Sequence, residues 1–210
     1  VSSMWTQGGV HAEEEIPEAV HFIRASTNKR DGLIGAILKL SREGRRELKR
    51  ERVDLDTLVT TATSSLQHQL DTAEAKIEIP EQLPSVVADR LALEQVFGNL
   101  LENAVKYLTD ERPGLIEITG EESGGRVRIN IRDNGRGIEE KDQERIFELF
   151  RRAGRQDRVG EGVGLAHVRA LTRRMGGDVT VVSTFGEGTT FTVDLPKKTR
   201  MKDSHAEIDA

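Results

Sequence analysis

The stretch Arg90–Leu108, RLALEQVFGNLLENAVKYL, decides the fold. It reads as a helix that Asp89 caps at its start and that ends near Leu108. Asn99 and Asn103 lie one helical turn apart on one face, and Lys106 and Tyr107 continue near that face. An amide oxygen can coordinate Mg²⁺, and lysine offers a point charge to phosphate. Taken alone, two asparagines more often only cap or decorate a helix.

A second motif, Asp133-Asn134-Gly135-Arg136-Gly137, ends an alternating strand. Asp133 could accept a hydrogen bond from the exocyclic amine of adenine, and Gly135 and Gly137 would let the base approach the backbone. The alternative is an ordinary turn, because Asp, Asn and Gly are favoured turn residues.

Two further glycine-rich motifs stand before a helix and between two strands. Gly160, Gly162 and Gly164 precede a helix start, where free N–H groups and the helix dipole favour phosphate. The alternative there is a flexible hinge. Gly186-Glu187-Gly188-Thr189 is a simple hairpin turn, or Thr189 donates to a phosphate or supports the site from beneath.

The remaining pattern predicts helices and antiparallel strands. Helices are expected at 55–70, at 139–147 and at 163–175. Short strands are expected at 76–79 and 85–88 around the turn Pro80–Pro84. Hairpins are expected from 114–121 to 126–133 and from 178–184 to 189–196. This order favours an α+β fold, a two-layer α/β sandwich with helices on one sheet face.

The N-terminal part differs from the rest. Residues 1–15 look unstructured, whereas residues 16–52 carry an apolar stripe at helical spacing with a charged opposite face. Such a helix, running to about Arg50, would be about 50 Å long and would need a partner helix or a second copy. The tail, residues 197–210, is charged and is expected to be disordered.

Composition narrows the classes of function. The 210 residues carry a net charge of −5, so general nucleic-acid binding is not expected. The absence of cysteine excludes disulfides and thiolate metal sites. No apolar run could span a bilayer and no signal peptide is visible, so we expect a cytoplasmic chain without membrane contact of its own. A membrane-anchored parent protein would not show itself here.

Taken together, the motifs closely resemble the boxes of the ATP-binding domain of sensor histidine kinases, a relative of topoisomerase, mismatch-repair and chaperone ATPases. The match spans about Asp54–Pro196, which places an ATP-binding domain at 53–196. The helix before it resembles the second helix of the family's dimerisation and phosphotransfer hairpin. The segments that carry the match are NLLENAVKY (99–107), DNGRG (133–137), FELFRR (147–152), GEGVGL (160–165) and GEGTTF (186–191).

The resemblance implies roles for individual residues. It places Asp133 at adenine, Asn103 at Mg²⁺ with Asn99 beside it, Lys106 at phosphate and Tyr107 near the adenosine. It implies that Gly160, Gly162, Gly164 and Leu165 form the phosphate-side hinge of an ATP lid at about 147–162. The nucleotide-binding set is completed by Gly135, Gly137 and Thr189. Lid arginines 151, 152, 155 and 158 are candidates for phosphate contacts or simply a solvated basic loop.

The implied partners are a response-regulator receiver domain and, through the complete hairpin, a second copy of the chain. No catalytic residue is assigned, because no histidine stands in the family's acceptor context. The family's acceptor is followed by an acidic residue and then a proline, whereas Phe22 follows His21 and Ala12 follows His11. We therefore expect that this chain lacks the first hairpin helix and has no acceptor of its own.

Four functions compete. A histidine-kinase catalytic portion fits best. Superfamily ATP hydrolases use a glutamate one turn before the metal asparagine as general base, where this chain has Asn99, and Glu102 points about 100° away from Asn103. A serine kinase of the same superfamily would not need the N-terminal helix. A non-catalytic dimerisation module would show damaged glycine boxes, and none is damaged.

Overall fold

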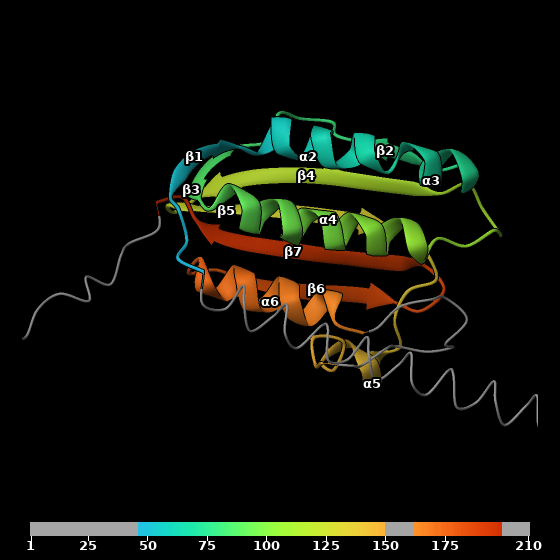
Figure 1. Ribbon diagram of the computed structural model, residues 1–210. Helices are drawn as coiled ribbons and strands as arrows, with labels where there is room; N and C mark the ends of the chain where they lie inside the picture. The colour runs from blue at the N-terminus through green and yellow to red at the C-terminus, as the bar shows by residue number, and fades with distance from the viewer. Residues whose placement is uncertain (1–45, 150–161, 199–210) are drawn as a thin grey trace, which may run out of the picture. The chain divides into compact units, whose positions relative to one another are not determined.

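The computed structural model describes residues 46–149 and 162–198, which apart from Arg46 belong to one compact unit beginning at Glu47. Figure 1 shows helices α2, α4 and α6 lying across one face of a sheet. In chain order the elements are β1 Glu51–Asp54, α2 Leu55–Ser65, α3 Gln67–Thr72, β2 Lys76–Glu78, β3 Ser85–Ala88, α4 Arg90–Lys106, β4 Leu115–Ser123, β5 Arg126–Asp133, α5 Glu140–Gln143, α6 Gly164–Arg174, β6 Asp178–Thr184 and β7 Gly188–Pro196.

The main sheet has five strands in the order β2-β4-β5-β7-β6, and β1 and β3 form a separate antiparallel pair. All neighbours in the main sheet are antiparallel except β2 and β4. Since three helices cover one face of this sheet, the predicted α+β two-layer sandwich is confirmed. The expected hairpins β4–β5 and β6–β7 are confirmed as well.

Alternation along the strands builds the core between the two layers. On β5, Val127, Ile129 and Ile131 are fully buried, whereas the intervening arginines and asparagine point to the other face. Phe97, in the middle of α4, is fully buried against this surface. Helix α4 therefore lies over the centre of the sheet, so the residues at its C-terminal end sit beside the end of β5.

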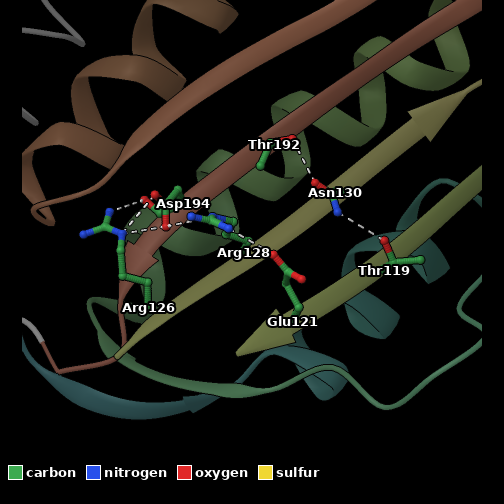
Figure 2. Close-up of polar contacts among 7 residues, drawn as sticks. All are labelled: Thr119, Glu121, Arg126, Arg128, Asn130, Thr192 and Asp194. Atoms are coloured by element: carbon green, nitrogen blue, oxygen red, sulfur yellow. Dashed lines mark hydrogen bonds and ion pairs between the residues drawn. The ribbon is translucent and has the colours of Figure 1, made fainter. Parts of the chain in front are cut away.

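The opposite face of the sheet is polar and carries its own side-chain network (Figure 2). The Nε of Arg126 lies 2.8 and 2.9 Å from the two carboxylate oxygens of Asp194, and Arg128 contacts Glu121 at 3.2 Å. Asn130 accepts a hydrogen bond from Thr192 at 2.8 Å. These cross-strand pairs satisfy one another's polar groups and stabilise this face of the sheet.

Asp89 fixes the start of α4 to the chain segment that enters the domain. One carboxylate oxygen accepts the N–H of Ala92 at 2.8 Å, which is the predicted N-cap, and the other accepts the N–H of Lys49 at 2.7 Å. The helix expected to run to Arg50 is wrong at its end, since residues 46–50 are not helical and β1 follows. The remainder of that predicted helix, residues 16–45, lies outside the described residues.

The short strands expected at 76–79 and 85–88 are present as β2 and β3, which pair with β4 and β1 respectively. Two local predictions need correction. The helix expected over 55–70 is divided at Leu66 into α2 and α3. The helix expected over 139–147 is reduced to the single turn of α5. Within the described ranges, no helix combines the length and apolarity needed to cross a bilayer.

Candidate functional site

Asp133, the last residue of β5, is a buried carboxylic acid with only 5% of its surface exposed. Its Oδ1 accepts the backbone N–H of Gly135 at 2.9 Å, and the backbone N–H of Thr189 is a second donor. Burial raises the pKa of Asp133 to about 6, against the opposing effect of these two N–H groups. A buried carboxyl poised at a strand end is a typical recognition group, because it can accept a hydrogen bond from a ligand amine.

The turn after Asp133 approaches its neighbours too closely for side chains. A Cβ on Gly135 would lie 2.4 Å from the carbonyl oxygen of Tyr107, and one on Gly137 would lie 2.1 Å from that of Thr184. Gly137 also has a φ of +69°, which disfavours any other residue. The absence of a Cβ at these two glycines allows the Asp133–Gly137 turn to pack between the end of α4 and the end of β6.

Tyr107, the C-cap of α4, joins the helix to this turn. Its carbonyl oxygen accepts the N–H of Arg136 at 3.0 Å. Its ring lies 5.2 Å from the Lys106 ammonium and 4.6 Å from the Arg136 guanidinium. An aromatic ring flanked by two cations therefore stands beside the Asp133 turn, which suits contact with a base or sugar and its phosphates.

Asn99 joins α4 to the start of α6. Its Nδ2 donates to the carbonyl of Gln95 at 2.7 Å, which orients the amide. Its Oδ1 faces Gly164, where a Cβ would lie only 2.7 Å away. Helix α6 begins at Gly164 without a side-chain cap, so its first N–H groups have no such partner. Helix α4 and Gly164, the last glycine of the motif before α6, are thus adjacent.

Thr189 and Gly188, at the start of β7, pack against Asp133 on the neighbouring strand β5. Thr189 pairs with Asp133 across β5 and β7, is only 7% exposed, and its hydroxyl lies 2.9 Å from that of Ser183. A Cβ on Gly188 would lie 2.0 Å from the carbonyl oxygen of Asp133. Of the alternatives left open by the sequence, a supporting role for Thr189 is the one that these contacts favour.

The structure therefore brings four predicted motifs to one end of the sheet. Asn103 lies half-buried one turn after Asn99, and Leu165 packs partly buried against the core. Gly162 stands just before α6, whereas Gly160 and the lid arginines lie outside the described residues. Phe147, at the start of the expected lid, packs edge-on against Phe191 at 6.3 Å and faces the Arg169 guanidinium at 5.2 Å.

Arg112, in the loop between α4 and β4, is a contact residue that sequence reasoning missed. Its guanidinium donates to the carbonyls of Asn134 at 2.8 Å, Gly135 at 2.9 Å, Gly186 at 2.7 Å and Glu187 at 3.3 Å. No local pattern signals this role, because the acceptors are far along the chain.

The chain is similar in sequence and in structure to known proteins. The family model described as "Histidine kinase-, DNA gyrase B-, and HSP90-like ATPase" matches residues 88–199. Cyanobacterial phytochrome B of Nostoc sp. is 35% identical over 168 residues, which are 79% of this chain and 22% of that protein. The sensor-like histidine kinase SenX3 of Mycobacterium tuberculosis is 34% identical over 177 residues, which are 80% of this chain and 42% of that protein.

Among solved structures, full-length ShkA in complex with AMPPNP is similar with a TM-score of 0.69 and 30% identity. The similarity covers 89% of this chain and 40% of ShkA. The chain thus spans less than half the length of each of these three relatives.

Proposed function

Because the chain belongs to the family of histidine kinase-, DNA gyrase B- and HSP90-like ATPases and carries the ATP-binding domain of a sensor histidine kinase, we propose how its residues serve that function. The domain binds Mg-ATP at the end of the sheet where α4, the Asp133–Gly137 turn and the start of α6 meet. It delivers the γ-phosphate to a histidine, from which a response-regulator aspartate receives it.

The single observation that carries this proposal is the buried Asp133 at the end of β5. Its carboxylate accepts a hydrogen bond from the adenine amine, which no guanine group at that position could supply. The Gly135 N–H holds the carboxylate in place, and Tyr107 borders the adenosine. Lys106 and the first N–H groups of α6 face the phosphates.

Magnesium fits the donor set of α4. The amide oxygens of Asn99 and Asn103 are hard ligands, and Mg²⁺ prefers one or two such ligands with water and phosphate oxygens completing its shell. The fixed amide of Asn99, with Nδ2 engaged by Gln95, leaves its oxygen directed toward the phosphate side at Gly164. When bound, the ion neutralises phosphate charge during phosphoryl transfer, and the α4 amides position it.

Hydrolysis is a weaker alternative. A water-activating general base would have to stand one turn before Asn103, and Asn99 there cannot accept a proton. Glu102 is exposed on α4, whereas Asn103 is half-buried. The site therefore has the ligands for phosphoryl transfer without a base suited to attack by water.

Asn103→Ala is expected to weaken nucleotide binding about tenfold in the presence of Mg²⁺ and little in its absence, because one oxygen ligand is lost. Calorimetric titration with ATP, with and without Mg²⁺, measures the difference. Asn130→Ala, on the polar face of the sheet, is the matched control and should keep the parent affinity in both conditions. Equal affinities for Asn103→Ala and the parent in both conditions would remove Asn103 from the site.

The chain by itself is expected to remain unlabelled at histidine when incubated with γ-labelled ATP. His167 is buried within α6, and His68 lies on α3 without the acidic residue and proline of the family's acceptor; His11, His21 and His205 lie outside the described residues. Alkali-stable, acid-labile label is the readout. Strong label that disappears in His21→Ala would show that His21 is the acceptor.

A further inference from the structure

Arg112 links two turns that border the nucleotide site. Its Nε and one Nη reach the Asn134 and Gly135 carbonyls, and the same Nη reaches the Gly186 and Glu187 carbonyls. Four carbonyl dipoles therefore converge on one cation that lies in neither turn. Charge-assisted hydrogen bonds of this kind are stronger than neutral ones.

The decisive contact is with the peptide group between Asn134 and Gly135. That group is planar and trans, so its carbonyl and its N–H point in opposite directions. Arg112 holds the carbonyl at 2.8 Å, and the N–H donates to Asp133 Oδ1 at 2.9 Å. Rotating this peptide would break both bonds, so the guanidinium keeps the donor aimed at the carboxylate.

The surrounding contacts fix the loop that carries Arg112. The side chain of Asn134 accepts the N–H of Leu115 at 2.8 Å and donates to the carbonyl of Pro113 at 2.9 Å. The Asp133–Gly137 turn and the α4–β4 loop are therefore joined by hydrogen bonds donated in both directions. The carbonyl of Arg136 accepts the N–H of Gly186 at 2.8 Å, so the two turns also meet directly.

We propose that Arg112 is a positioning residue of the nucleotide site, which orients the Asn134–Gly135 peptide toward Asp133 and ties the Asp133–Gly137 turn to the β6–β7 turn. The inference rests on the proposed function, because the ligand whose base it positions is ATP. This role requires no contact between Arg112 and the phosphates or the base. Its planar guanidinium reaches separated acceptors that the single ammonium of lysine could not reach together.

The experiment compares Arg112→Met, which keeps a long apolar side chain without donors, with Arg128→Met on the polar face. Arg128 is a matched control, since its partners Glu121 and Asp194 lie away from the turns (Figure 2). For each variant the ATP dissociation constant is measured by calorimetry below the melting temperature. The pKa of the Asp133 carboxyl is measured by carbon NMR without nucleotide.

Arg112→Met is expected to raise the ATP dissociation constant on the order of tenfold, since a misplacement of about 1 Å at a functional site can cost about a hundredfold. It is also expected to raise the pKa of Asp133 further above its usual range, since the Gly135 N–H that lowers this pKa loses its orientation. Arg128→Met should change neither quantity. Should Arg112→Met fail to fold, Arg112→Lys is measured in the same way, with smaller shifts in both quantities expected.

A variant that melts at lower temperature but keeps the parent's ATP affinity and Asp133 pKa would show that Arg112 only stabilises the fold. That result would overturn the proposal. The NMR titration needs no nucleotide. It therefore tests the effect of Arg112 on Asp133 independently of ATP binding. A parent protein that fails to bind ATP would instead overturn the proposed function.

Discussion

Asp133→Asn is expected to stabilise the folded protein above pH 6 and, in the same molecule, to weaken its binding of ATP. The pKa of Asp133 is raised from 3.8 to about 6 by burial, so folding favours the protonated carboxyl. Stability is therefore greatest below pH 4 with respect to this group, falls as the pH rises toward 6, and stays reduced above it. Asparagine has no charged form and avoids this loss.

The size of the effect follows from the shift. One pKa unit corresponds to about 1.4 kcal/mol, so ionised Asp133 lowers the free energy of unfolding by up to about 3 kcal/mol above pH 6. The asparagine oxygen can still accept the Gly135 and Thr189 N–H groups. Urea unfolding at pH 4.5 and pH 7.5 checks this, and the gain of the variant over the parent should be about 1 kcal/mol at the lower pH and about 3 kcal/mol at the higher pH.

The same change places an amide donor where the adenine amine needs an acceptor. Losing a hydrogen bond to a charged group costs about 2–3 kcal/mol, which is about 30–150-fold in the dissociation constant of ATP. The preference for ATP over GTP should narrow, because the new amide can donate to the guanine oxygen. Asp194→Asn, which pairs with Arg126 on the polar face, is the control. An Asp133→Asn protein with the parent's ATP/GTP ratio would place the base elsewhere.

The sequence predicted best those features that depend on neighbours in the chain. The cap by Asp89, the span of α4 and the two hairpins rest on local spacing and turn residues, and the structure has all of them. The pairing of β3 with β1 and the parallel pairing of β2 with β4 join segments separated by long stretches of chain. Alternation of apolar residues identifies a strand but not its partner, so these pairings could not be predicted.

The candidate site divides in the same way. Residue type and motif order indicated Asp133, Asn99 and Asn103, whereas Arg112 gave no signal because its acceptors lie in turns more than twenty residues away. The glycines show a different limit. Gly137 was expected to make room for a base, yet a Cβ there would meet the carbonyl of Thr184. Its absent side chain makes room for the protein's own last hairpin.

Gly137→Ala is accordingly expected to lower the free energy of unfolding by about 2–5 kcal/mol. A φ of +69° costs a residue with a Cβ about 1–2 kcal/mol, and an added methyl in a filled space costs about 1–3 kcal/mol more. The clash is with backbone, since the carbonyl oxygen of Thr184 would lie 2.1 Å and the Cα of Phe185 2.9 Å from the new Cβ. Neither atom can move without displacing the β6–β7 turn.

Gly124→Ala separates the two causes of this loss. Gly124 has a similar φ of +59°, but a Cβ there would meet nothing within 4 Å. Its substitution should cost only the backbone strain, about 1–2 kcal/mol, and leave ATP affinity unchanged. Urea unfolding of both variants therefore isolates the contact with Thr184 as the difference. Equal losses would mean that the β6–β7 turn yields freely and that the close approach of Gly137 to Thr184 adds nothing to the loss.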